Sequence, residues 1–225
     1  NLHRVVITGL GAVTPIGNTV DKYLSGLQNG LNGVESITLF DASNHACRFA
    51  AEVKGFDPTG VLEPKESKRW DRFSKFGVVA AKEALKDSGL IIDDSNSSRV
   101  GVIIGSGVGG LLTMETQAGV LNSKGANRVS PFTVPMMIPN MATGLAAIAL
   151  GAKGPSSAVS TACAAGSNAI GDAFRLIQLG KADAMVCGGA EASITPLGVA
   201  GFASAKALSF RNDDPASASR PFDAE

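Results

Sequence analysis

Short runs rich in β-branched residues alternate with segments of helical periodicity, and this alternation constrains the fold more than any other feature of the sequence. Such alternation predicts an α/β fold, in which helices cover a largely parallel sheet. The expected strands span residues 5–10, 48–53, 100–104, 156–160 and 184–188. The expected helices span residues 20–27, 71–88 and 166–180. A length of 225 residues fits one domain or part of one.

The two longer expected helices each carry apolar residues at helical spacing, which predicts one buried face. In the first, the apolar stripe consists of Trp70, Phe73, Phe76, Ala80 and Ala84, and Gly89 closes the helix. In the second, apolar residues lie on one side (Ile170, Ala173, Phe174, Ile177) and polar residues on the other (Asn168, Asp172, Arg175, Gln178). Gly180 marks the end of that helix.

Charge and cysteine content exclude several classes of function. Lys plus Arg equals 20 and Asp plus Glu equals 20, so no global field favours binding of nucleic acid or another polyanion. The three cysteines, Cys47, Cys163 and Cys187, form no Cys-x-x-Cys pair for zinc or redox exchange. The N-terminal residues lack the apolar segment of a secretion signal. We therefore expect a reducing compartment, no metal and no cofactor.

Residues 129–152 contain no charged side chain and are numerous enough to cross a bilayer. Three prolines interrupt this stretch, at Pro131, Pro135 and Pro139, with Asn140 and Gly144 close by. A lipid-facing helix would lose several backbone hydrogen bonds at these positions. The stretch is therefore predicted to be buried protein, either core or subunit interface, and no membrane contact is expected.

A glycine-rich segment, Gly105-Ser106-Gly107-Val108-Gly109-Gly110, follows the expected strand at 100–104 and formally matches the dinucleotide pattern G-x-G-x-x-G. A dinucleotide site also needs an acidic residue about 20 positions further on to hold the ribose. No Asp or Glu occurs between Glu115 and Asp172. The glycines are therefore predicted to form a tight turn that brings Val108 beside a buried cavity.

Cys163 lies where a strand feeds the start of a helix, inside a turn of small residues at 161–167. Unpaired N–H groups and the macrodipole at a helix N-terminus stabilise a thiolate, the nucleophilic form of cysteine. The small neighbours leave room for a thioester and let the Cys163 N–H point at a developing oxyanion. Position alone also allows the alternative that Cys163 is a buried small hydrophobic residue.

The run V-S-T-A-C-A-A-G-S-N-A-I-G at 159–171 resembles the active-site segment of the β-ketoacyl-acyl-carrier-protein synthases. Further landmarks of that family occur in the family order along the whole chain: Val5 to Gly11, Thr14 to Gly17, Gly105 to Gly110, Gly188 to Glu191, Gly201-Phe202, Ala207 to Ser209 and Ser219 to Asp223. The chain is most similar to the elongating, type II members. The resemblance implies a thiolase-like layered αβαβα fold, of which residues 1–225 would supply the N-terminal half.

In this family the cysteine, here Cys163, accepts an acyl chain from acyl carrier protein. Malonyl-acyl carrier protein then loses carbon dioxide, and the resulting carbanion attacks the thioester, so a fatty acid grows by two carbons. The family also uses two histidines and a lysine to hold the developing enolate. His3 and His45 are the only histidines here and match no family motif. The resemblance therefore places the catalytic histidines in the C-terminal half.

The resemblance also implies substrate-binding and docking residues. The substrate-binding residues would be Gly107, Val108, Thr133, Ala162 and Phe202. Of these, Val108 would border the far end of the acyl pocket, Phe202 its entrance, and Thr133 the acyl pocket of a partner subunit, so we expect a homodimer. Docking of the acidic carrier protein would use Lys65, Lys68, Arg69 and Lys206.

The charge pattern around residues 64–76 gives a second, independent indication of a docking surface. Lys65, Lys68, Arg69, Arg72 and Lys75 follow helical spacing and predict a local basic face. By itself this pattern equally fits a solvated helix surface.

Three alternatives to a synthase differ from it in substrate, nucleophile or catalytic competence. A thiolase shares the fold and the nucleophilic cysteine but uses coenzyme A substrates, and a non-catalytic partner subunit lacks the cysteine. A serine hydrolase is disfavoured because no Gly-x-Ser-x-Gly segment occurs. The expected location of a synthase of this type is the cytoplasm, or alternatively the plastid stroma.

Overall fold

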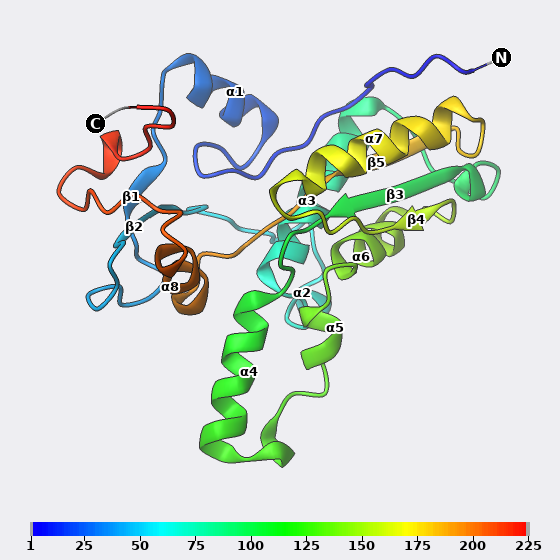
Figure 1. Ribbon diagram of the computed structural model, residues 1–225. Coiled ribbons are helices and arrows are strands. Elements are labelled where there is room, and N and C mark those ends of the chain that lie inside the picture. The colour runs from blue at the N-terminus through cyan, green and yellow to red at the C-terminus, as the bar shows by residue number, and fades with distance from the viewer. Residues whose placement is uncertain (1, 224–225) are drawn as a thin grey trace. The chain divides into compact units, whose positions relative to one another are not determined.

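The computed structural model describes residues 2–223 and divides the chain into two compact units (Figure 1). The sheet unit comprises Asn1–Val13 and Asp57–Ala192, and the small unit comprises Thr14–Phe56 and Ser193–Glu225. Each unit is therefore built from two separate stretches of the chain.

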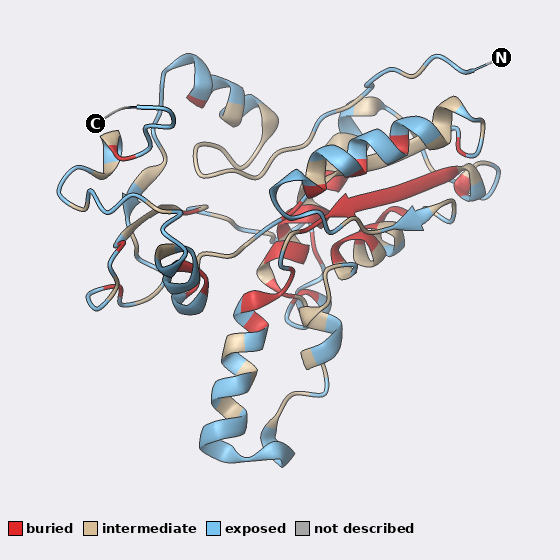
Figure 2. Ribbon diagram, viewed as in Figure 1, coloured by how far each residue is buried: buried red, intermediate tan, exposed pale blue. Residues whose placement is uncertain are grey.

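A three-stranded parallel sheet with strand order β4-β3-β5 forms the centre of the sheet unit. β3 spans Val100–Gly105, β4 spans Ser156–Ser157 and β5 spans Ala184–Gly189. β3 and β5 pair along their whole lengths, from Val100 opposite Ala184 to Gly105 opposite Gly189. Every residue of β3 is buried, as Figure 2 shows, which is what an apolar run in the middle of a parallel sheet predicts.

Helices cover both faces of this sheet, so the unit has three layers (Figure 1). The side chains of Val102 and Ile104 pack into one cluster with residues of α3 (Arg72–Ser88) and α6 (Met141–Leu150). Ile103 points to the opposite face and packs against Ala169 and Ala173 of α7 (Ala165–Gln178). The two-residue period of a strand thus divides β3 between two cores.

Helix α3 begins and ends where the sequence predicted. The Asp71 carboxylate accepts the N–H of Phe73 at 3.2 Å and caps the first turn, while Gly89 ends the helix at a φ of +67°. The inward face of α3 includes Phe73, Phe76 and Val78. The other elements of the sheet unit are α2 (Pro64–Ser67), α4 (Leu111–Lys124), α5 (Thr133–Met137) and the 3₁₀ turns Ser97–Arg99, Ala126–Arg128 and Ala162–Ala164.

The small unit contains α1 (Val20–Gln28), an antiparallel pair of β1 (Val34–Ser36) with β2 (Phe49–Ala51), α8 (Pro196–Ser204) and the 3₁₀ turn Pro215–Ser217. Glu52, which is buried, follows β2 and joins it to the segment after β1. Its carboxylate accepts N–H groups from Thr38 at 2.9 Å and Leu39 at 3.1 Å. A buried charge needs such partners, because an unpaired one would be costly to desolvate.

The predicted strand at 5–10 is wrong. These residues are extended, but they belong to no ladder in the part of the chain that the structure describes, and Ile7 is 81% exposed. The segment is held by α3 instead: Asp87 accepts the N–H of Leu10 and Glu83 that of Ala12, both at 2.9 Å. Gly9 lets the segment approach the helix backbone, since a Cβ there would lie 2.2 Å from the carbonyl oxygen of Ala84. The predicted strands at 48–53 and 156–160 form, but they are shorter than expected.

The uncharged stretch 129–152 folds into α5 and α6, and α6 confirms the core prediction. Ala142, Ala146 and Leu150 are buried, whereas Ile148 on the outer side is 80% exposed. Among the described residues, no helix is long and apolar enough to cross a membrane. A role of the outer side in a subunit interface stays a prediction.

The apolar side expected for α7 is only partly buried. Ala169 and Ala173 are buried against β3, whereas Ile170 and Phe174 are 51% and 44% exposed. The helix therefore meets the sheet through its alanines, which permit a closer approach than Ile or Phe would.

Thr143 of α6 is a buried polar residue that the hydrophobic pattern did not identify. Its hydroxyl accepts the N–H of Ile104 at 2.9 Å and has two carbonyl acceptors for its one proton, on Ile104 at 3.1 Å and on Ser157 at 3.0 Å. The hydroxyl thus ties α6 to both β3 and β4 where their ladder ends.

Replacing Thr143 by Val should lower the free energy of unfolding by about 1–3 kcal/mol, because the buried N–H of Ile104 loses its acceptor. The matched control is Thr116→Val, since the Thr116 hydroxyl bonds the Leu112 carbonyl on an exposed helix surface. The control substitution should change the free energy of unfolding by less than about 0.5 kcal/mol. Urea unfolding of both variants measures the difference, and equal midpoints would contradict the role given to Thr143.

Candidate active site at Cys163

Cys163 lies in the 3₁₀ turn Ala162–Ala164, immediately before α7, as the sequence predicted. Of the three cysteines only Cys163 is exposed, so the alternative of a buried structural residue is wrong. No side chain caps the first turn of α7, whose N-cap residue is Ala164. The leading N–H groups of the helix therefore lie beside the thiol without a side-chain acceptor.

The backbone before Cys163 has an uncommon conformation. Ala162 has a φ of +51°, in the left-handed region that residues other than glycine rarely adopt. Two contacts close the turn: the Thr161 hydroxyl donates to the Asn168 side-chain oxygen at 2.8 Å, and the Ala164 N–H donates to the Thr161 carbonyl at 3.1 Å. Strain of this kind persists only where the surrounding structure holds it, and it is common at functional sites.

The start of α7 lies directly on the carboxyl ends of β3 and β5. A Cβ on Gly105 would lie 2.3 Å from the Ala165 carbonyl oxygen, and one on Gly166 would lie 3.2 Å from the Cα of Gly189. The first distance leaves no room for a side chain at Gly105, and the second makes a side chain at Gly166 tight against β5. The carboxyl edge of a parallel sheet is where α/β proteins commonly bind ligands, and this edge presents Cys163.

The glycine-rich segment after β3 forms the tight turn that was predicted. Gly109 has a φ of +74°, and a Cβ on it would lie 2.8 Å from the Met137 carbonyl oxygen. The Glu191 carboxylate accepts the N–H groups of Gly107 at 2.7 Å and Val108 at 3.1 Å. In a nucleotide-binding protein, successive amides of such a turn would bind a phosphate. Here the Glu191 carboxylate occupies that position.

The turn brings three of the predicted site residues together. A Cβ on Gly107 would lie 3.4 Å from the carbonyl carbon and oxygen of Ala162, so Gly107 is adjacent to the residue that precedes Cys163. Val108 follows Gly107 and is 39% exposed. The buried cavity expected beside Val108 stays a prediction.

The other predicted pocket residues lie on separate elements. Thr133 is the first residue of α5, and its hydroxyl donates to the Ser130 carbonyl at 2.6 Å. Phe202 belongs to α8 in the small unit and is 47% exposed. Their substrate contacts stay predictions.

The predicted continuous basic face from Lys65 to Lys75 is wrong in one respect. α2 ends at Ser67 and α3 begins at Arg72, because the extended backbone of Asp71 (ψ 160°) separates the two helices. Lys65, Lys68 and Arg69 are exposed on the first part.

Two of the arginines in this region lie over aromatic rings. The Arg69 guanidinium lies 4.5 Å from the centre of the Phe132 ring, and Arg72 lies 5.2 Å from that of Phe76. Burial lowers the pKa of Lys75, although Asp71 opposes that shift. Lys206, the fourth predicted docking residue, follows α8 in the small unit with a φ of +56°.

Only His3 shares the sheet unit with Cys163, and it lies far from the thiol. The His3 N–H donates to the Gln178 carbonyl at 3.0 Å, so His3 lies at the C-terminal end of α7. Cys163 lies at the other end of this 14-residue helix, about 21 Å away at 1.5 Å per residue. His45, in the small unit, makes a tilted contact with the Phe40 ring, with ring centres 5.1 Å apart, and has its Nε2 3.1 Å from the Pro196 carbonyl oxygen. His3 is exposed and His45 is partly buried in a loop, which fits ordinary surface or loop histidines.

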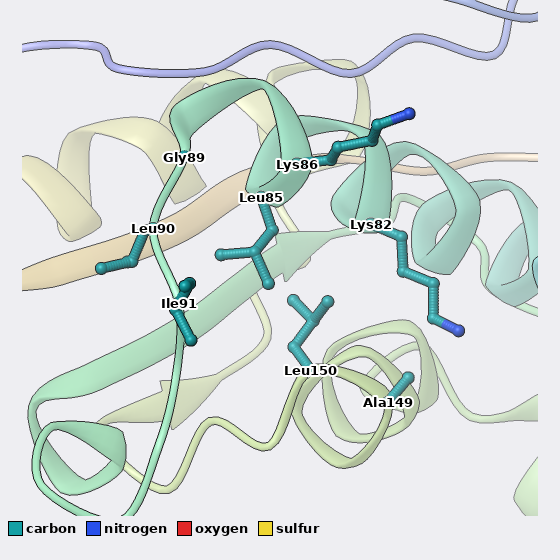
Figure 3. Close-up of a pocket in the computed structure, with 8 residues that line it drawn as sticks. All are labelled: Lys82, Leu85, Lys86, Gly89, Leu90, Ile91, Ala149 and Leu150. Carbon is teal, nitrogen blue, oxygen red and sulfur yellow. The ribbon is translucent and has the colours of Figure 1, made fainter.

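The sheet unit also contains a cavity of about 380 Å³ between the C-terminal ends of α3 and α6 (Figure 3). Its lining is apolar apart from two lysines and consists of Lys82, Leu85, Lys86, Gly89, Leu90, Ile91, Ala149 and Leu150. The Lys82 ammonium donates to the Val61 carbonyl at 2.6 Å. Since α3 and α6 cover the sheet face opposite α7, this cavity is separate from Cys163. Within residues 2–223, no group of three or more His, Cys, Asp or Glu side chains could hold a metal.

The three-layered fold and the exposed thiol at the sheet edge define an α/β protein with an accessible cysteine at the carboxyl ends of its parallel strands. Comparison with known proteins narrows this class. Residues 2–224 match the beta-ketoacyl synthase N-terminal domain, and the chain therefore belongs to the beta-ketoacyl synthase family.

Curated relatives and solved structures agree with this family. The chain is 62% identical over 98% of its length to 3-oxoacyl-[acyl-carrier-protein] synthase 2 of Synechocystis sp., and 50% identical to that of Vibrio cholerae. It covers 53% of each relative, so it spans about half their length. A beta-ketoacyl synthase from Burkholderia phymatum superposes with a TM-score of 0.86 at 34% identity, over 99% of this chain and 55% of that one. A ketosynthase in complex with its type II polyketide acyl-carrier protein matches with a TM-score of 0.77 at 31% identity.

Sequence reasoning found Cys163 and its turn but missed the part played by Glu191, which it used only as a landmark. A usable signal was present. Glu191 lies two residues after the end of β5 at Gly189, and the neighbouring parallel strand β3 is followed by a glycine turn whose amides need an acceptor.

We expect iodoacetamide at neutral pH to alkylate Cys163 at least about tenfold faster than the other two cysteines. Cys163 is exposed at a helix start, Cys47 is buried, and burial raises the pKa of the Cys187 thiol. Mass-spectrometric mapping of the folded protein over time measures the three rates. Comparable rates at all three positions would contradict activation of Cys163.

Proposed function

We propose that this chain carries the nucleophilic part of a 3-oxoacyl-[acyl-carrier-protein] synthase that elongates fatty acids, with Cys163 as the acyl acceptor. The observation that carries the proposal is the exposed Cys163 thiol on a strained turn at the start of α7. The identity of 62% to a synthase of that name supports the assignment.

The proposed reaction has two bond exchanges at Cys163. First, its thiolate attacks the carbonyl carbon of an acyl thioester, a new carbon–sulfur bond forms, the bond to the carrier sulfur breaks, and the carrier leaves as a thiolate that takes a proton from water. Next, malonyl-acyl carrier protein loses carbon dioxide, and the released electron pair forms a carbon–carbon bond to the acyl carbon. Cys163 then leaves as a thiolate. The N–H of Cys163 at the helix start would stabilise the oxyanion that develops in both exchanges.

Decarboxylation needs further donors, and the resemblance assigns them to two histidines and a lysine. His3 and His45 bond elsewhere in the structure. We therefore propose that the catalytic histidines lie outside the present sequence, and that residues 1–225 form the N-terminal half of the complete catalytic fold.

We propose that Gly107, Val108 and Ala162 border the bound acyl chain, together with Thr133 and Phe202. The contact of Gly107 with Ala162 supports the first group, because it places the turn after β3 beside the thiol. Thr133 would act across a homodimer interface. The apolar outer side of α6, with Ile148 80% exposed, supports such an interface.

We propose that acyl carrier protein docks on Lys65, Lys68, Arg69 and Lys206. The exposed cationic side chains of the first three support this, and so does the similarity to a ketosynthase whose structure includes its acyl-carrier protein. Stacking on Phe132 holds the Arg69 charge in place, which reduces the entropy lost on docking. The bacterial relatives favour the cytoplasm over the plastid stroma.

Transfer of a labelled acyl group to Cys163 tests the proposed function in the protein at its natural full length. Donors bound to acyl carrier protein should acylate Cys163 at least about tenfold faster than the same acyl group on coenzyme A, because docking adds binding energy that only the carrier can use. The Cys163→Ala variant is the blank.

Two outcomes would contradict the proposal. Faster transfer from coenzyme A would indicate a thiolase-type enzyme. No transfer from either donor would indicate a non-catalytic partner subunit.

The double variant Lys65→Glu with Lys68→Glu should raise the KM for carrier-bound substrate about tenfold or more at low salt, since charge reversal opposes an acidic partner. The kcat should change little, because docking and chemistry are separate steps. Arg69 is left intact because it packs on Phe132.

The matched control reverses two exposed lysines elsewhere in the sheet unit, Lys124 and Lys181. An equal rise in KM for this control would show that overall charge, rather than the surface at Lys65 and Lys68, sets the affinity.

A further inference from the structure

We infer that Glu191 is a positioning residue for Cys163: its carboxylate holds the Ser106–Gly109 turn, and that turn fixes the strained backbone before the nucleophile. The inference rests on the proposed function, because it concerns the geometry of acyl transfer. Glu191 itself touches no reacting atom in this account.

The Glu191 carboxylate organises the turn through both of its oxygens. Oε2 accepts the N–H groups of Gly107 at 2.7 Å and Val108 at 3.1 Å, and Oε1 accepts the Ser106 hydroxyl at 3.3 Å. The Ser106 oxygen in turn accepts the N–H of Gly109 at 3.0 Å. One side chain thus fixes all four residues of the turn.

The position of Glu191 is itself fixed by the sheet. The preceding residue, Ala190, donates its N–H to the Gly105 carbonyl at 2.9 Å, directly after the β3–β5 pairing ends at Gly105 and Gly189. The carboxylate therefore reaches across from the end of one strand to the turn that follows its neighbour.

The turn then contacts the segment that leads to Cys163 at two points. The Ser106 N–H donates to the Val159 carbonyl at 3.0 Å. Gly107 lies against the backbone of Ala162, where an added Cβ would be 3.4 Å from the carbonyl carbon and oxygen. Ala162 is the residue with a φ of +51°, and it directly precedes Cys163. If the turn moved away, the Ala162 backbone could leave its left-handed conformation. The Cys163 N–H would then shift away from the oxyanion that forms in the proposed acyl transfer.

A carboxylate near a thiol could act instead through its charge alone. Two conservative variants separate charge from position. Glu191→Gln removes the charge but keeps the length and one oxygen able to accept both amides. Glu191→Asp keeps the charge but is shorter by one methylene and cannot span the same contacts. If Glu191 acts by positioning, the Asp variant should be acylated more slowly than the Gln variant. If it acts by charge, the Gln variant should be the slower one.

The test measures acylation of Cys163 by a carrier-bound acyl donor in the full-length protein. We expect Glu191→Gln to stay within about threefold of the natural protein and Glu191→Asp to be at least about tenfold slower, because small displacements at a reacting centre have large effects on rate. Alkylation by iodoacetamide, which needs no oxyanion site, should change less than about threefold in both variants.

The control is Asp183→Asn, which alters an exposed carboxylate before β5, at the opposite edge of the sheet. Its acylation rate should equal that of the natural protein. A slower Gln variant with a normal Asp variant, or equal rates for both, would overturn the inference. So would a fall in the Asp variant accompanied by rapid labelling of buried Cys47, because that would reflect unfolding. If the natural protein itself is not acylated, the proposed function fails instead.

Discussion

The close approach of the α7 backbone to the carboxyl ends of β3 and β5 is the constraint on which the site depends. Gly105 and Gly189 end the two strands, and Gly166 lies in the first turn of the helix facing them. Because no side chain separates these backbones, the helix start has little freedom to shift, and Cys163 is placed by main chain on both sides. The alanines at 169 and 173 continue the same contact along β3. A side chain at Gly105, where a Cβ would lie 2.3 Å from the Ala165 carbonyl oxygen, would push the helix start away and move the thiol with it.

The same edge of the sheet shows why a nucleotide-like sequence pattern need not bind a nucleotide. A glycine turn after a strand exposes several N–H groups, and those groups need an acceptor. In a phosphate-binding protein the ligand supplies it. Here Glu191 supplies it from the neighbouring strand, so the turn is complete without a ligand. The turn is consequently free to serve as a support for the segment that contains Cys163.

Structure that depends on residues close in sequence was predicted correctly. Predictions failed where a contact with a residue distant in sequence determines the structure. Both ends of α3 could be predicted because Asp71 and Gly89 act within one turn of the helix. The segment at 5–10 has the composition of a strand, but its partners are the carboxylates of Glu83 and Asp87, more than 70 residues away. Cys163 was found because its small neighbours and the following helix are contiguous in sequence. The roles of Thr143 and Glu191 could not be predicted, because their contacts join segments that only the fold brings together.

Under the proposed function, a nucleophile held by main-chain contacts has a consequence for how the catalytic work is divided. The residues around Cys163 are small and mostly uncharged, and the histidine of the same unit lies at the far end of α7. In the proposed reaction this part of the fold would hold the acyl group in a fixed orientation and stabilise the oxyanion, but the sheet unit supplies no nearby imidazole for proton transfer. Separating the two tasks lets the acyl acceptor remain rigid while acid–base groups approach from another part of the protein. A rigid acceptor loses little entropy when the thioester forms, and the second substrate then meets a target whose geometry is already set.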